Sequence, residues 1–149
     1  IDKDFYHMPT YHTPFEAYDE SEQHEKYPLY HYCERTRWHL HTQYNHAPVL
    51  RELDPEPYLR MNPVDAEARG IAEGDYVEAY NDRGHCVCKA KFDMGVRPGM
   101  VSSPKGWHRG AYVAGSYQEL TCDHLNLLHM NTSFDDTLVE VRKYEGEVR

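Results

Sequence analysis

Arginine and histidine alternate along one short stretch of this chain, and a threonine follows them: Arg35, Arg37, His39, His41 and Thr42. Alternate residues of a β-strand point to the same face, so an extended stretch would bring the four basic side chains together. A guanidinium offers a fork of N–H donors, and a neutral imidazole offers one donor and one acceptor. The stretch therefore predicts a site for a phosphate or for the polar edge of a heterocycle, with a solvated strand face as the alternative.

A second candidate site lies in the run from Pro55 to Val77. Asn62 precedes Pro63, and this pair predicts a helix start, because Asn is a favourable N-cap and Pro fits the first helical position. Asp65 places a negative charge in the first turn, where the helix dipole favours it. A carboxylate could also accept hydrogen bonds from the N–H edge of a purine. From the residues alone, the capping and the ligand-binding interpretations of Asn62 and Asp65 both stay open.

The third candidate is the loop Lys105-Gly106-Trp107-His108. A lone Trp is more often a core residue, but Trp and His beside a Gly in a loop could stack on a ring and contact an anion. The sequence contains no GxSxG, P-loop, HExxH or GxGxxG motif, so it shows no catalytic set. The spacing His39-x-His41, with His46 nearby, leaves a metal site of the cupin type as an alternative.

Composition narrows the classes of partner. The 149 residues include 16 Lys and Arg against 25 Asp and Glu, and the net charge of −9 argues against binding to nucleic acid or to anionic membranes. No apolar run approaches the roughly 18 residues of a membrane span. The start Ile1-Asp2-Lys3-Asp4 lacks a Met, so we expect a piece of a longer or processed protein. Four cysteines without a CxxC pair predict buried thiols in place of a disulfide framework or a zinc site: Cys33, Cys86, Cys88 and Cys122.

Local patterns predict a mainly-β fold. The run from Pro55 to Val77 predicts a strand, a capped helical turn that ends near Gly70, and a second strand over 76–80. A turn at 81–84 and the alternating run 86–92 complete a β-hairpin, and 137–142 predicts a closing strand. Such short strands between turns are typical of a barrel. We expect residues 1–26, which are polar and rich in His and acids, to form an N-terminal arm or linker, and 27–149 to form the domain.

Taken in order, these pieces resemble the molybdopterin dinucleotide-binding domain at the C-terminus of dimethyl sulfoxide reductase-family enzymes. The resemblance rests on an ordered series of motifs over roughly residues 27 to 143: Tyr27-Pro28-Leu29, Arg35, His41-Thr42, Pro55-Glu56-Pro57, Asn62-Pro63-x-Asp65-Ala66, Gly70-Ile71-x-x-Gly74-Asp75-x-Val77, Arg83-Gly84, Pro98-Gly99, Gly106-Trp107, Leu120-Thr121 and Leu138 to Val141. Two positions depart from the family pattern. Gln118 stands where the family often has Asn, and Cys33 stands where it frequently has Thr.

The resemblance implies a six-stranded double-psi β-barrel with short helices, which closes over a bis(molybdopterin guanine dinucleotide) cofactor. By position, Arg35, His41 and Thr42 become candidates for pterin or phosphate contacts. The remaining implied cofactor-binding residues are Asn62 and Asp65 for guanine, Trp107 and His108 near a pterin, and Gln118 for a polar contact. No catalytic or metal-ligating residue is implied in this chain, because the Mo or W is held by other domains of the parent enzyme.

The implied partners are the remaining domains of a larger oxidoreductase and an iron–sulfur electron-transfer subunit, in a setting such as anaerobic respiration. The parent would work in a bacterial or archaeal cytoplasm or periplasm, with any export signal upstream, and the isolated domain is not expected to catalyse. Two other classes are weighed against this interpretation. One is a stand-alone cupin-like enzyme with a metal on His39, His41 and His46, and the other is a cofactor-free double-psi barrel interaction module.

Overall fold

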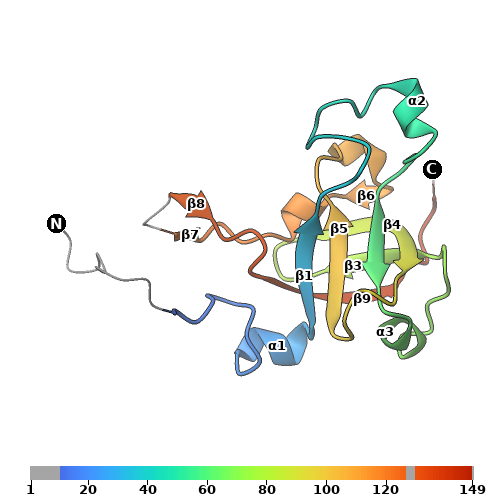
Figure 1. The fold of residues 1–149 in the computed structure, drawn as a ribbon. Coiled ribbons are helices and arrows are strands. Elements are labelled where there is room, and N and C mark those ends of the chain that lie inside the picture. Colours follow the sequence, from blue (N-terminus) through green and yellow to red (C-terminus); the bar gives the residue numbers. More distant parts are fainter. Residues whose placement is uncertain (1–10, 127–129, 149) are drawn as a thin grey trace.

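The computed structural model of the chain describes residues 11–126 and 130–148 (Figure 1). Its helices are short and its strands mostly short. In chain order the elements are α1 (Glu22–Lys26), β1 (Leu29–Glu34), α2 (Pro48–Arg51), β2 (Tyr58–Met61), α3 (Pro63–Glu67), β3 (Tyr76–Tyr80), β4 (His85–Phe92), β5 (Met100–Pro104), the 3-10 turns η1 (Arg109–Ala111) and η2 (Tyr117–Glu119) with β6 (Ala114–Gly115) between them, β7 (Leu125–Asn126), β8 (Asn131–Thr132) and β9 (Thr137–Lys143).

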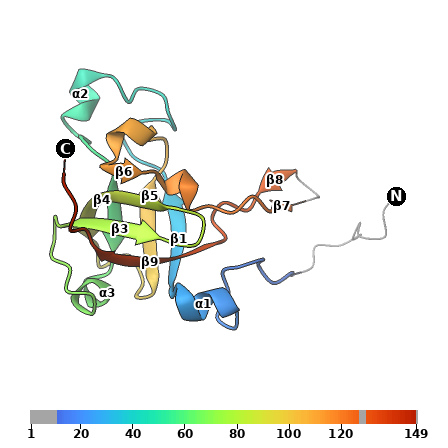
Figure 2. The ribbon, with the colours of Figure 1, turned by 180° about the vertical axis from the view of Figure 1, so that it is seen from behind.

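Six of these strands form a closed barrel. They are hydrogen-bonded in the order β2-β5-β1-β9-β3-β4, and β2 also pairs with β4, which closes the ring. The pairs β1–β5 and β2–β4 are parallel, while β1–β9, β2–β5, β3–β4 and β3–β9 are antiparallel. Parallel neighbours require crossover connections, and these carry the chain across the barrel ends (Figures 1 and 2). The predicted six-stranded β-barrel is confirmed.

The barrel interior follows the alternation of the strands. Positions in β2 and β3 alternate between half-buried and buried, as expected where one strand face packs inward. In β4 the consecutive residues Cys86, Val87 and Cys88 are all buried, because β6 pairs with this strand and η2 also contacts it. The largest fully buried apolar side chains are Leu29, Leu59, Met61, Val77, Val87, Val101, Leu120, Leu138, Val139 and Val141.

The run from Pro55 to Val77 folds as its local signals predict. Asn62 caps α3, since its side-chain Oδ1 accepts a hydrogen bond of 3.0 Å from the Val64 amide. Gly70 lies just beyond the helix with φ of +66°, a backbone conformation that glycine adopts without steric cost. The predicted strand at 76–80 coincides with β3, and the predicted strand at 137–142 lies within β9.

The part of the predicted arm that the structure describes, residues 11–26, is fastened to the barrel beside β9. The carboxylate of Asp136 accepts hydrogen bonds from the amides of Phe15, Glu16 and Ala17. The carboxylate of Glu16 accepts two hydrogen bonds from Arg83, at 2.6 and 3.0 Å, and one of 2.8 Å from the Leu138 amide. These contacts fix residues 15–17 against the start of β9, although α1 itself buries no side chain.

The cysteines behave as predicted, because all four are free and Cys33 alone among them is only half-buried. Burial raises the pKa of the Cys33 thiol to about 12, and the neighbouring Asp135 carboxylate adds to the shift. Among the helices of the described residues, none has the length and apolar character needed to cross a membrane.

Candidate functional site

The stretch that carries Arg35 to Thr42 is a loop. β1 ends at Glu34, and residues 35–57 leave one end of the barrel, pass through α2 and return to β2 (Figure 1). The prediction that Arg35, Arg37, His39 and His41 share one strand face is therefore wrong. Its physical cause is a sharp change of direction, since His41 has a positive φ of 52°, which a β-strand does not allow.

His39 points into the protein and anchors this loop. Its side chain is 2% exposed, and its Nε2 lies 3.0 Å from Oδ2 of Asp54, near the far end of the same loop. Its Nδ1 lies 3.0 Å from the Thr36 hydroxyl, and its ring meets the Trp107 ring edge-on at 4.9 Å between centroids. Burial raises the pKa of Asp54, and the nearby His39 opposes that shift. His39 therefore joins both ends of the loop to the loop that follows β5.

Trp107 belongs to the core rather than to an exposed platform. Its side chain is buried within the hydrophobic cluster, with only 5% of its surface exposed. The preceding Gly106 has a φ of +94°, and a Cβ at this position would lie 1.8 Å from the carbonyl oxygen of His41. Asn45 donates a side-chain hydrogen bond to the carbonyl of Gly106. Only a residue without a side chain allows the two loops this close approach, which fixes the backbone of His41.

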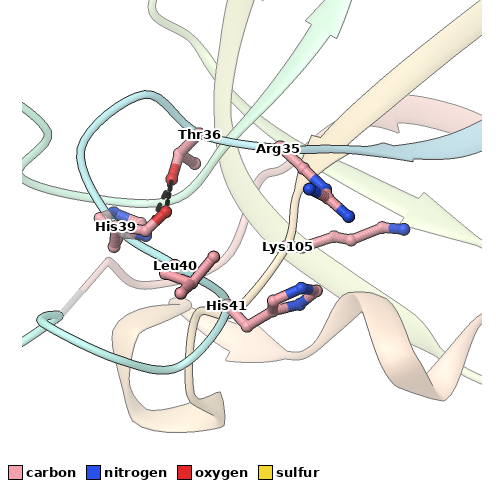
Figure 3. A pocket seen from close by; sticks show the side chains of 6 residues that line it. All are labelled: Arg35, Thr36, His39, Leu40, His41 and Lys105. Atoms are coloured by element: carbon pink, nitrogen blue, oxygen red, sulfur yellow. Dashed lines mark hydrogen bonds between the residues drawn. The ribbon is translucent and has the colours of Figure 1, made fainter.

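A small pocket of about 60 Å³ opens where these loops meet, lined by Arg35, Thr36, His39, Leu40, His41 and Lys105. We call it the cationic pocket. Figure 3 shows the side chains of Arg35, Lys105 and His41 extending toward the same side, whereas Thr36 and His39 turn to the other side and hydrogen-bond to each other. Two permanent cations and an imidazole thus face one small space. Such a donor set suits phosphate oxygens or the carbonyl edge of a polar ring.

Other predicted site residues flank the cationic pocket or carry its loops. Thr42 and His108 are exposed, and the His108 ring stacks on that of His46 at 5.8 Å, which brings the two loops together again. Gln118 is exposed on η2, in the segment that follows the Trp107 loop. These side chains are accessible to a ligand larger than the pocket.

Asn62 and Asp65 lie at the other end of the barrel, on and beside α3 (Figures 1 and 2). The Asn62 side chain is buried and uses both its groups, because its Nδ2 also donates to the carbonyl of Val96 at 2.7 Å. Oδ2 of the half-buried Asp65 accepts a hydrogen bond of 2.8 Å from the Gly99 amide. The structure thus separates these two residues from the cationic pocket, and their contacts support the capping interpretation.

With this geometry in view, the comparison with protein families is decisive. The model of the family described as "Molydopterin dinucleotide binding domain" matches residues 29–138, which include the barrel from β1 to the start of β9. The chain belongs to this family. It is a molybdopterin dinucleotide-binding domain of the dimethyl sulfoxide reductase family, as the ordered motifs predict. The matched span contains the whole of the cationic pocket and both loops that form it.

Curated relatives place this domain within much longer chains. A dimethyl sulfoxide reductase catalytic chain of Halobacterium salinarum is 37% identical to it over 123 residues, which cover 83% of this chain and 15% of that protein. The "Pyrogallol hydroxytransferase large subunit" of Pelobacter acidigallici is 33% identical to it over 165 aligned positions, covering 95% of this chain and 19% of that protein. The chain therefore spans less than a fifth of the length of these relatives.

A solved structure confirms the fold. Acetylene hydratase from Pelobacter acetylenicus superposes with a TM-score of 0.80 and 19% sequence identity, over 92% of this chain and 21% of that chain. At this level of identity the likeness concerns the fold alone. The same barrel is thus one part of a larger protein there as well.

The cationic pocket fits the anionic cofactor of this family. A molybdopterin dinucleotide carries phosphates and a pterin with a polar edge, and the pocket presents the guanidinium of Arg35, the ammonium of Lys105 and the imidazole of His41 to one space. The metal alternative finds no such support. Within 11–126 and 130–148, no group of three or more His, Cys, Asp or Glu side chains could hold a metal ion. His39, which that alternative requires, is buried against Asp54.

Lys105 is the pocket residue that the sequence-based selection of site residues missed. Its side chain is only 19% exposed, and its backbone amide donates to the carbonyl of Glu34 at 2.8 Å, which sets the end of β5 beside the end of β1. The parallel pairing of these two strands places Lys105 next to Arg35. A lysine just before a Gly-Trp pair in a loop that meets an Arg-rich loop is the signal that could have identified it.

Proposed function

We propose that this domain holds the pyrophosphate or pterin portion of a molybdopterin guanine dinucleotide in the cationic pocket, as one wall of the cofactor site of a larger molybdenum or tungsten oxidoreductase. The observation that carries the proposal is the convergence of Arg35, His41 and Lys105 on one space, at a barrel end formed by two interlocked loops. When bound, the cofactor supplies oxidation and reduction chemistry at its metal, which groups outside this domain ligate.

Each residue has a separate role in this proposal. Arg35 offers a planar fork that matches two oxygens of a phosphate, and Lys105 offers a compact charge. His41 donates or accepts one hydrogen bond from a position that Gly106 fixes by close approach. The exposed groups of Thr42, His108 and Gln118 border this space and would contact parts of the cofactor that extend beyond the pocket, while the buried Trp107 supports the loop.

The guanine assignment of Asn62 and Asp65 remains a prediction of the resemblance. Their observed hydrogen bonds to Val64, Val96 and Gly99 supply a sufficient structural reason for both residues. We therefore give the cationic pocket the first place in the proposal.

The parent enzyme supplies the rest of the site. Because the chain covers 15% and 19% of the lengths of two curated relatives, the remaining domains of the same polypeptide are its nearest partners. We propose that the parent is an oxidoreductase that exchanges electrons through an iron–sulfur subunit, that it serves anaerobic respiration, and that the isolated domain is inactive. The relatives named after dimethyl sulfoxide reductase support this class of reaction.

The test uses the parent enzyme, expressed anaerobically with Arg35→Gln and, separately, His41→Gln. Molybdenum and tungsten are measured by mass spectrometry, and the guanosine monophosphate released by acid hydrolysis is quantified per protein. We expect stoichiometric metal and nucleotide in the wild type and a severalfold loss of both in each variant. Lys143→Gln, which removes a cation paired with Asp75 elsewhere on the barrel, is the matched control. A wild type without metal and guanine nucleotide, or variants that retain both fully, would refute the proposal.

A further inference from the structure

Residues 134–136 join the β8 strand to β9 and contact the cationic pocket on one side and the N-terminal arm on the other. The ring of Phe134 lies under the Lys105 ammonium, with 4.3 Å between Nζ and the ring centroid. Oδ2 of Asp135 lies 4.0 Å from the same Nζ. Asp136 binds the amides of residues 15–17. One short segment thus connects the fastening of the arm with the position of a pocket cation.

The Asp135 carboxylate is itself held in place. Its Oδ1 accepts a hydrogen bond of 2.8 Å from the backbone amide of Cys33, near the end of β1. The backbone of Lys105 is tied to the same strand through the Glu34 carbonyl. Both charged residues are therefore referenced to β1, and their separation of 4.0 Å reflects the fold rather than the free motion of two surface side chains.

The separation has a chemical consequence. At 4.0 Å the carboxylate partly balances the ammonium without a short hydrogen bond, so the N–H donors of Lys105 can still reach another acceptor. The Phe134 ring attracts the cation through its π face and cannot be displaced by an anion. An anionic ligand that enters beside Arg35 and His41 would compete with Asp135 for Lys105 while the ring keeps the ammonium in position.

We propose that Phe134 and Asp135 are positioning residues for Lys105: the ring holds the ammonium at the cationic pocket, and the carboxylate is the internal counter-ion that the anionic group of the ligand replaces. This inference rests on the proposed function, in which the pocket takes an anionic portion of the cofactor. It adds the way in which the affinity of that pocket is set, by two residues whose side chains do not line it.

The experiment is calorimetric titration of the 149-residue chain with GDP and with inorganic pyrophosphate at low salt, using single variants. Lys105→Gln should weaken binding about tenfold, as expected for the loss of a charge-assisted contact. Asp135→Asn keeps an acceptor for the Cys33 amide but removes the charge, and should tighten binding about threefold. Phe134→Leu should weaken binding about threefold, whereas Phe134→Tyr keeps the ring and should match the wild type.

A double-mutant cycle separates positioning from general structural effects. In the Lys105→Gln background, Asp135→Asn and Phe134→Leu should no longer change the affinity, because the group on which they act is absent. Asp75→Asn removes a carboxylate of similar pairing elsewhere on the barrel and should leave the affinity unchanged in both backgrounds. If Asp135→Asn tightens binding equally with and without Lys105, the carboxylate acts by general repulsion and the inference is overturned.

The remaining outcomes distinguish this inference from the proposed function. Binding that is lost in Arg35→Gln but unchanged in Lys105→Gln would overturn the role of Lys105 and of its two positioning residues, and would leave the cationic pocket as the cofactor site. A wild-type chain that binds neither GDP nor pyrophosphate at millimolar concentration would overturn both.

Discussion

The attachment of the N-terminal arm makes a quantitative prediction about stability. Glu16 is buried at the junction of the arm with β9, where its side chain is 10% exposed and accepts two hydrogen bonds from Arg83 and one from the Leu138 amide. A hydrogen bond that involves a charged group contributes about 1.5–3 kcal/mol. Arg83 is 35% exposed, so solvent screening reduces the part that comes from the ion pair.

Two substitutions at Glu16 divide these contributions. Glu16→Gln keeps an acceptor for the Leu138 amide and loses the charge, and we expect it to lower the free energy of unfolding by about 1 kcal/mol. Glu16→Ala also leaves the buried Leu138 amide without an acceptor, and this adds about 1–3 kcal/mol. The total for Glu16→Ala is then about 3 kcal/mol, a large share of the stability of a domain of this size.

The assay is urea unfolding of the 149-residue chain, followed by circular dichroism and tryptophan fluorescence. Glu20→Ala, at an exposed position of the same arm, serves as control and should change stability by less than about 0.5 kcal/mol. If Glu16→Ala costs no more than Glu20→Ala, the arm is not fastened at this point in solution and the reasoning is refuted.

Three further predictions concern the barrel and its ends. Burial lowers the pKa of His31 to about 4 from an ordinary 6.5, so the unfolded chain takes up a proton first as pH falls; stability should drop by about 3 kcal/mol between pH 7 and pH 4. His31→Gln should abolish that part of the pH dependence in urea titrations, and an unchanged slope would contradict it. Gly106→Ala should cost on the order of 3 kcal/mol, because a Cβ would strike the His41 carbonyl, whereas Gly74→Ala, with a positive φ but open space, should cost about 1–2 kcal/mol; equal thermal shifts would exclude the clash. Asn62→Ala should cost about 2–3 kcal/mol through the lost helix cap and an unpaired buried carbonyl, and a loss under about 0.5 kcal/mol in denaturant unfolding would show that neither contact matters.

The sequence predicts those parts of the fold that local rules determine. The Asn62-Pro63 pair marks a helix start wherever it occurs with an acidic first turn, and the alternation over 76–80 requires only one buried face. The ordered series of motifs adds the barrel type and the cofactor class, which single motifs could not do.

The cationic pocket is predictable only in part, because long-range contacts build it. Arg35 and His41 can be selected as site residues from the sequence, but the geometry that joins them comes from Gly106, in a distant loop, which fits against His41 only without a side chain. Alternating polar residues favour a strand in the sequence, while the positive φ of His41 and the inward turn of His39 toward Asp54 follow from packing. No local pattern at Lys105 announces its neighbours in 134–135.

The most direct test of the central claim is a structure of the parent enzyme with its cofactor bound. We predict that phosphate or pterin atoms lie within about 3 Å of the side-chain nitrogens of at least two of Arg35, His41 and Lys105. A cofactor that lies elsewhere on the barrel, with the cationic pocket filled by a side chain of another domain, would contradict the account.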